Sequence, residues 1–254
     1  MKVISIANHK GGVGKSTSVA CIGEALSMAK KKVLLIDLDA QQNLTYFFSK
    51  EELPEKSVYD TLLKREPLPV MKVDERLDIV PASILLARAD RDMNSIPLRE
   101  LRLKKAIESL KGRYDYILLD CPPSLGIVTT NALVASTDVY IPLTAEALPL
   151  QGLSMLKDFI EETQEELNPE LRLSGIFVTR FGRKRINMDI YELLEENYPS
   201  ILFETKIREN VSLAETPLLS GNIFKEFPSS TGAADYKALT DEILRRERKS
   251  VNKK

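Results

Sequence analysis

The sequence HKGGVGKST, residues 9–17, follows directly on the apolar run VISIA, residues 3–7. A β-forming run, a glycine-rich turn and a helix-forming stretch in this order predict a phosphate-binding loop. Gly11, Gly12 and Gly14 have no Cβ, so successive backbone N–H groups can curl around phosphate oxygens. A helix that begins near Lys15 adds the positive end of its dipole at the same place. We therefore predict a nucleotide-binding loop.

Two side chains of this loop have predicted roles in phosphate chemistry. Lys15 is expected to reach the β- and γ-phosphates, and the Ser16 hydroxyl to ligate Mg²⁺. The usual pattern GxxxxGK[ST] has a glycine where this chain has His9, and Lys10 stands just before the glycine pair. His9 is the only histidine and has no partner in the sequence pattern, so we interpret it as a turn residue. The alternative, a glycine-rich turn that binds nothing, requires all these residue types to coincide behind a strand.

The composition predicts one globular protein without a strong overall charge. Its 254 residues are enough for one large domain with a buried core. Lys and Arg number 36 against 37 Asp and Glu, so a basic surface for a polyanion must be local. Cys21 and Cys121 lie far apart in apolar contexts, which argues against a zinc or iron–sulfur site. With no signal peptide or membrane span expected, we predict a cytoplasmic protein.

Strands and helices alternate along the chain. Strands are predicted at residues 3–7, 33–37, 77–81, 116–120, 138–143, 173–179 and 201–205. Helices are predicted at residues 18–29, 58–65, 83–92, 98–110, 126–135, 150–167, 188–197 and 232–247, and prolines 67 and 69 mark a loop. Most strands are continuously apolar, which is typical of a parallel sheet covered on both faces. We expect an α/β fold of the P-loop NTPase type, a mostly parallel, twisted sheet of about seven strands in a single domain over residues 1–254, with a basic C-terminal tail at about 245–254.

Acidic side chains follow two of these strands at the edge where ligands bind in open α/β sheets. Asp37 closes one strand and Asp39 lies just past it, where a carboxylate can order an attacking water or help hold a metal shell. Asp120 ends another apolar strand in the Walker B form, whose acid binds Mg²⁺, commonly through a water. Each signal alone is weak, because acids at strand ends are often only solubilising. In this chain order, the loop and the acids together strongly indicate a magnesium–nucleotide site.

The chain resembles the ParA/Soj family of DNA-segregation ATPases, which have a deviant Walker A motif, over nearly its full length. The segments that carry the resemblance are KGGVGKST, LLIDLDAQQNLT, YILLDCPPSLG, YIPLTAEALPLQGL, and IRENVSLAETP followed by SSTGAADY. It implies that Asp39 positions the hydrolytic water, that Asp37 supports the metal site, and that residues 120–126 form the second switch. It also implies that Lys10 contacts phosphates held by the partner subunit of an ATP-bound homodimer.

The resemblance extends the predicted site to the adenine end, after the last two predicted strands. The predicted nucleotide-binding residues are Lys10, Gly11, Gly12, Val13, Gly14, Lys15, Ser16, Thr17, Thr179, Arg180, Ile207 and Arg208. The predicted metal-site residues are Ser16, Asp37, Asp39 and Asp120, and the predicted catalytic residues are Lys10, Lys15 and Asp39.

The chain departs from the family pattern at three points. Residues 40–42 are Ala-Gln-Gln where the family usually has Pro-Gln-Gly, so we expect a less sharply turned first switch. Ser212 stands where an arginine is common, which removes one candidate DNA contact. The larger branch of the family has an N-terminal helix-turn-helix domain. Because the glycine-rich loop here starts at residue 9, we expect the small, Soj-like form.

The resemblance implies slow, Mg²⁺-dependent ATP hydrolysis that is accelerated by a ParB-like, centromere-binding partner, and an ATP-bound dimer on the bacterial nucleoid. We expect nonspecific, salt-sensitive binding of duplex DNA, since few aromatic residues accompany the basic ones. The candidate DNA contacts are Arg183, Lys184, Arg185, Lys206, Arg208, Lys225, Arg245 and Arg246, and the tail adds Arg248, Lys249, Lys253 and Lys254. The alternative is that these cations belong to solvated faces and a frayed tail.

Other members of the superfamily fit less well. A MinD-like ATPase needs a C-terminal amphipathic helix, but Val251 is the only sizeable apolar residue after Leu244, so no membrane partner is expected. Iron–sulfur relatives need suitably placed cysteines, and bacterial tyrosine kinases a tyrosine-rich tail. A positioning ATPase or scaffold that does not act on DNA remains the alternative function.

Overall fold

The computed structural model describes residues 1–49, 55–145, 149–219 and 221–251. Within these residues the strands form one seven-stranded sheet in the order β3-β4-β2-β5-β1-β6-β7. Its strands are β1 (Lys2–Ile6), β2 (Val33–Asp37), β3 (Met71–Asp74), β4 (Leu77–Val80), β5 (Tyr116–Asp120), β6 (Asp138–Thr144) and β7 (Arg172–Thr179). All neighbours pair in parallel except β3, which runs antiparallel to β4 at one edge. The predicted α/β fold with a mostly parallel sheet is confirmed.

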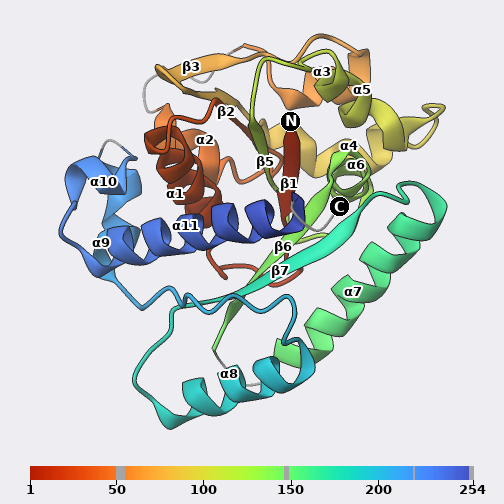
Figure 1. Ribbon diagram of the computed structural model, residues 1–254. Coiled ribbons are helices and arrows are strands. Elements are labelled where there is room, and N and C mark those ends of the chain that lie inside the picture. The colour runs from red at the N-terminus through yellow and green to blue at the C-terminus, as the bar shows by residue number, and fades with distance from the viewer. Residues whose placement is uncertain (50–54, 146–148, 220, 252–254) are drawn as a thin grey trace.

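Helices cover both faces of the sheet (Figure 1). One face carries α1 (Lys15–Met28), α2 (Asn43–Phe48), α9 (Val211–Glu215), α10 (Ile223–Glu226) and α11 (Thr231–Val251). The other carries α3 (Val58–Lys64), α4 (Ala89–Asp92), α5 (Arg102–Glu108), α6 (Ile127–Ala135), α7 (Pro149–Glu166) and α8 (Arg185–Asn197). Short 3₁₀ turns lie at Ile84–Arg88, Arg99–Leu101 and Thr216–Leu218.

The central strands are mostly apolar because the sheet has a hydrophobic core on each side. In β2, Leu34 and Ile36 enter the core under α3 and α5, whereas Val33 and Leu35 enter the core under α1 and α11. All four side chains are fully buried. Alternate residues of a strand point to opposite faces, so a strand buried on both sides has few positions for polar side chains.

The predicted strand at residues 201–205 is wrong, since it contributes only an isolated bridge between Ile176 and Leu202. Side chains of α11 form hydrogen bonds with backbone groups of residues 202, 204 and 205. Arg246 donates to the carbonyl of Leu202, and Glu242 accepts from the N–H groups of residues 204 and 205 at 3.0 Å each. Backbone groups satisfied in this way do not need a ladder partner.

The edge strand β3 was not predicted, because prolines 67 and 69 indicated a loop. Its residues alternate between half-buried and exposed, and it pairs on one side only. A short edge strand carries little hydrophobic signal. The short helices α2, α9 and α10 were also not predicted.

The end of the chain differs from the expected tail. The predicted helix 232–247 continues as α11 to Val251, so Arg245, Arg246, Arg248 and Lys249 lie on a helix. The remaining tail residues, including Lys253 and Lys254, lie outside the described residues. None of the helices in the described part of the chain combines the length and hydrophobicity that a bilayer crossing requires.

Candidate nucleotide-binding and hydrolysis site

The three sequence segments predicted to form the site meet at the carboxyl edge of the sheet. Strands β2, β5 and β1 are neighbours, and their last residues are in register. Asp120 of β5 pairs with Ile6 of β1 on one side and with Asp37 of β2 on the other. The glycine-rich loop after β1 and the two acidic strand ends therefore lie side by side, where ligands bind in open α/β sheets.

The loop turns through two glycines into α1. Gly12 and Gly14 have φ values of +73° and +87°, a left-handed conformation that side chains rarely adopt. Helix α1 starts immediately after Gly14, so its first N–H groups point into the loop. The entry to the loop is fixed by Asn8, whose side-chain amide donates to the Pro142 carbonyl at 2.7 Å and accepts from the Lys10 N–H at 2.9 Å.

Lys15 is a buried cation in the centre of the site. Only 6% of the residue is exposed, and its ammonium donates to the Lys10 carbonyl at 3.3 Å. Lys10 itself is exposed at the rim of the loop. A buried ammonium is costly without anionic partners, so the position of Lys15 favours a bound anion.

The two acids after β2 have different surroundings. Asp37 is fully buried and accepts from the Thr45 N–H at 2.8 Å, the Thr45 hydroxyl at 2.7 Å and the Asp39 N–H at 3.0 Å. Burial raises the pKa of Asp37 to about 6 despite these hydrogen bonds. Asp39 lies nearer the surface, at 9% exposure, and accepts from the Gln41 N–H at 2.9 Å. Asp37 therefore holds the start of α2, while Asp39 holds the turn that follows β2.

The first switch is tightly turned despite its unusual sequence. The Gln42 N–H donates to the Asp39 carbonyl at 2.9 Å, and Gln42 has φ +59°, in the left-handed region. The expected relaxation of this turn is not seen. Gln42 adopts the backbone that a glycine would favour, at a cost in strain.

Asp120 has the properties of a metal-site carboxylate. It is fully buried, and neither side-chain oxygen has a hydrogen-bond partner within the described residues. Burial, followed by the charge of Asp37, raises its pKa well above the usual range, while the Ser16 hydroxyl and the Lys15 charge lower it. An unpartnered buried carboxylate beside a hydroxyl fits a hydrated Mg²⁺ shared with nucleotide phosphates.

No group of three or more His, Cys, Asp or Glu side chains in the described ranges could hold a metal ion. Mg²⁺ at nucleotide sites commonly uses one or two protein ligands together with phosphate oxygens.

A cavity of about 450 Å³ opens beside the loop and contains all four residues predicted for the adenine end. Thr179 forms its junction with the loop, because its hydroxyl donates to the Val13 carbonyl at 2.9 Å. The cavity is lined by Val13, Gly14, Thr17, Thr179, Arg180, Ile207, Arg208, Glu209, Asn210, Val211, Leu213, Ala214 and Tyr236. The α9 residues and Tyr236 were not predicted as site residues, although their segments carried the resemblance.

Six of the eight basic side chains predicted to contact DNA interact within the chain, and five of these six lie outside residues 183–185. Arg208 forms a bidentate pair with Asp235, with a shortest N–O distance of 2.6 Å, and Lys206 lies 3.5 Å from the ring centre of Tyr191. The others are Lys225 with Asp74, Arg245 with Glu204, and Arg246 with Glu242 and the ring of Phe203. Contacts with phosphate would compete with these interactions.

The other three candidates, Arg183, Lys184 and Arg185, are consecutive and exposed where the loop after β7 enters α8. Arg185 approaches Asp189 at 3.9 Å, a pair in which both side chains are largely exposed. Exposed pairs of this kind contribute little. We define residues 183–185 as the basic segment.

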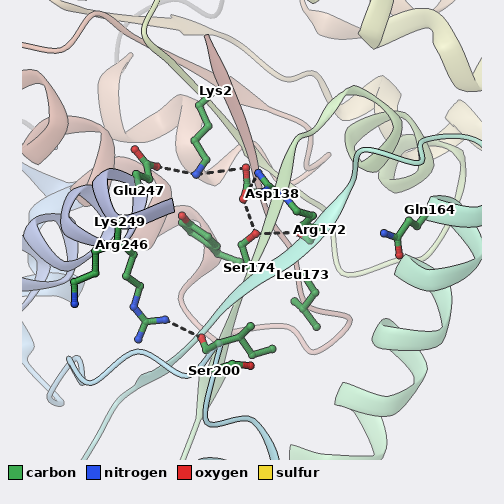
Figure 2. A pocket seen from close by; sticks show the side chains of 12 residues that line it. Lys2, Asp138, Gln164, Arg172, Leu173, Ser174, Ser200, Arg246, Glu247 and Lys249 are labelled. Atoms are coloured by element: carbon green, nitrogen blue, oxygen red, sulfur yellow. Dashed lines mark hydrogen bonds and ion pairs between the residues drawn. The ribbon is translucent and has the colours of Figure 1, made fainter. Parts of the chain in front are cut away.

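A second cavity, of about 640 Å³, lies at the amino edge of the sheet, away from the glycine-rich loop. Figure 2 shows Lys2 between Asp138 and Glu247. Its ammonium pairs with Asp138 at 3.4 Å and with Glu247 at 2.9 Å. Arg246 and Lys249 of α11 contribute to the same wall. Because the cations meet acids here and the glycine-rich loop is absent from the lining residues, this cavity is not the nucleotide site.

Residues 1–173 match a family model described as an AAA domain. The chain is 38% identical to the sporulation initiation inhibitor protein Soj of Bacillus subtilis, over 95% of this chain and 98% of that protein. A Mycobacterium smegmatis structure named cobyrinic acid a,c-diamide synthase, with a bound ATP analogue and magnesium, superposes with a TM-score of 0.85 at 33% identity, covering 98% and 96% of the two chains. A plasmid partition protein of Borrelia burgdorferi bound to AMPPNP gives 0.83 at 28% identity, covering 96% and 99%.

Proposed function

The chain belongs to the ParA/Soj family of partitioning ATPases, and from that premise we propose that it segregates DNA by an ATP-gated cycle of dimerisation and DNA binding. It is an ATPase that uses ATP and Mg²⁺. The observation that carries the proposal is the meeting of Lys15, Asp39 and the unpartnered Asp120 at one edge of the sheet, with Lys10 exposed on its rim.

In the proposed mechanism, the chain supplies positioning and charge for phosphoryl transfer. The loop N–H groups and Lys15 bind the phosphates, and Asp39 orients the attacking water. Ser16 and Asp120 would hold Mg²⁺, and the metal ion would neutralise part of the negative charge of the phosphates. Asp37 acts as a positioning residue, because its hydrogen bonds to Thr45 and Asp39 fix the first switch.

In the proposed cycle, ATP hydrolysis requires a dimer, because each site needs a lysine from the second copy. Lys10 is exposed on the loop at the rim of the site, and in the proposed dimer it contacts phosphates held by a second copy. The basic segment then supplies nonspecific contacts to the duplex backbone, two copies per dimer. Hydrolysis, stimulated by a ParB-like partner, removes the γ-phosphate that holds the switches and so releases the DNA.

An Asp39→Ala variant tests this cycle. We expect it to retain ATP binding, to lose most hydrolysis, and to accumulate as an ATP-bound dimer that retains duplex DNA. Light scattering after size exclusion, a phosphate-release assay and DNA retention measure the three properties. The matched control is Asp241→Ala, which removes an exposed acid of α11.

Normal hydrolysis by the Asp39 variant would show that another group orients the water. A trapped dimer that does not retain DNA would instead support the alternative function, a positioning ATPase or scaffold that does not act on DNA.

A further inference from the structure

A separate cavity of about 290 Å³ lies between α3 and α5, helices that pack together in Figure 1. Its wall includes the basic residues Arg65, Arg102 and Lys105, and none of its lining residues belongs to the nucleotide site. The hydroxyl-bearing residues Thr61 and Ser109 also line it. We refer to it as the α3–α5 pocket.

The charges of this pocket are not balanced within the described residues. The Nε atom of Arg102 is buried and has no hydrogen-bond partner there. Glu66 is the acid among the lining residues, but its carboxylate already pairs with Lys56 at 2.7 Å. Burial and then the nearby charge of Arg65 lower the pKa of Arg102. Cations gathered without a free acid leave a site of positive potential.

Two residues of the pocket wall are held in an uncommon backbone conformation. Arg65 has φ +60° and Leu98 has φ +54°, both in the left-handed region. Arg65 is held there by its N–H bond to the Thr61 carbonyl at 3.2 Å, and the Thr61 hydroxyl donates to the Pro67 carbonyl at 3.3 Å. Arg65 is the C-cap of α3 and Leu98 precedes the 3₁₀ turn at Arg99–Leu101, so the ends of these elements shape this wall.

The first turn of α5, which carries Arg102, is also held by α6. Buried Asn131 of α6 accepts from the Leu103 N–H at 3.1 Å and donates to the Arg99 carbonyl at 2.9 Å. The backbone that carries Arg102 is therefore set before any ligand arrives, which lowers the ordering cost of binding.

We propose that the α3–α5 pocket binds a small organic phosphate, a phosphate monoester dianion with a short carbon body. Two guanidinium groups and an ammonium more than offset the charge of a dianion, and guanidinium binds phosphate oxygens in pairs. The volume is at the small end of the range for ligand sites. Leu98, Pro67 and Ala106 supply an apolar wall for the carbon atoms.

The test is calorimetric titration of the full chain with glycerol 3-phosphate and, separately, inorganic phosphate. The glycine-rich loop is first saturated with ADP and Mg²⁺, because it also binds phosphate. We expect one ester per chain. Arg102→Gln should weaken ester binding about tenfold or more, since it removes charge-assisted hydrogen bonds. Thermal melts check that each variant is folded.

Lys105→Gln and Lys104→Gln form a matched pair on α5, because Lys105 lines the pocket and Lys104 does not. We expect weaker ester binding for the first variant and unchanged binding for the second. Leu98→Ala should weaken the ester more than inorganic phosphate.

Three results would overturn the proposal. The first is no ester binding at millimolar concentration, and the second is an equal loss in the Lys104 and Lys105 variants. The third is equal affinity for both probes, which would assign the pocket to inorganic phosphate. If Arg102→Gln weakened duplex DNA binding but not ester binding, the pocket would instead belong to a DNA surface. Because the nucleotide site is filled throughout, the outcome does not depend on the proposed DNA cycle.

Discussion

Glu24 of α1 is a buried acid that the nucleotide chemistry does not use. Only 2% of the residue is exposed, and neither carboxylate oxygen has a hydrogen-bond partner within the described ranges. Burial raises its pKa to about 9, opposed by the Ile223 backbone and the Lys225 charge. The folded chain therefore keeps Glu24 protonated at neutral pH, because an ionised carboxylate there would lack compensation.

This state makes the free energy of unfolding depend on pH. The folded pKa of about 9 lies above the unfolded value of 4.5, so the folded chain binds the extra proton between these limits. The stability contribution is complete below pH 4.5 and is lost as the pH rises toward 9. Between pH 5 and pH 8 the loss amounts to a few kcal/mol.

A Glu24→Gln variant should lose this dependence, because the amide does not ionise. Relative to the parent chain, its free energy of unfolding should rise by a few kcal/mol from pH 5 to pH 8. Urea denaturation at both pH values measures the change, with Glu108→Gln on the exposed side of α5 as the control. Equal pH slopes for variant and parent would show that Glu24 is ionised in the folded chain.

At the scale of elements, the first switch stores strain at the start of α2. Gln42 precedes this helix in a left-handed conformation and is buried, whereas the neighbouring Gln41 is exposed. The turn follows Asp39 directly, so its shape sets the position of the proposed water-orienting carboxylate. A side chain other than glycine or asparagine at such a backbone costs roughly 1–2 kcal/mol.

Substitutions at Gln42 should separate strain from packing. Gln42→Asn keeps the amide and suits the left-handed backbone, so it should stabilise the chain by up to about 1 kcal/mol. Gln42→Val should destabilise it by about 1–2 kcal/mol, because a branched Cβ is least compatible with this conformation. Chemical denaturation measures both, and Gln41→Val should stay within about 0.5 kcal/mol of the parent. Equal effects of Asn and Val would contradict stored strain.

The position of the basic segment is fixed by a buried side chain of α8, Asn187, which we call the latch. The Asn187 side chain accepts from the Gly182 N–H at 3.0 Å and donates to the Ala145 carbonyl just after β6. It therefore joins the loop after β7, the first turn of α8 and the end of β6. The exposed cations of residues 183–185 start from this fixed point.

Asn187→Ala should weaken duplex DNA binding several-fold without changing its salt dependence, because the number of cations stays the same. Arg183→Gln should reduce the magnitude of the slope of log K against log salt by about one for each Arg183 in the dimer. Fluorescence anisotropy over a salt series distinguishes the two, with Asn197→Ala at the other end of α8 as the control. A changed salt slope in the Asn187 variant would mean that the latch is itself part of the DNA contact.

At the scale of the whole molecule, the sheet has a hydrophobic core on each face, and this arrangement explains which strands could be predicted from the sequence. Strands 33–37 and 116–120 were predicted to the residue, because burial on both sides leaves an unbroken apolar run. The site followed from chain order, since parallel neighbours bring the loop, Asp37 and Asp120 to one edge. Local patterns sufficed for these strands, and chain order sufficed to predict that the three segments meet at one edge of the sheet.

The remaining features depend on residues far apart in the chain. The run 201–205 resembled a strand, but Arg246 and Glu242 of α11 bind its backbone groups. The internal partners of Arg208 and Lys206 are also tertiary contacts, and so is the α9 wall of the cavity beside the glycine-rich loop. Composition and periodicity contain no information about such pairs.

The measurement that tests the central claim most directly is binding to random-sequence duplex DNA without nucleotide, with ADP and with ATP, over a salt series. We predict tight binding only with ATP, equal affinity for unrelated sequences, and a slope of log K against log salt of about −5 for six cations per dimer. Absence of binding with ATP, while light scattering shows a dimer, would contradict the account and leave an ATPase that does not act on DNA.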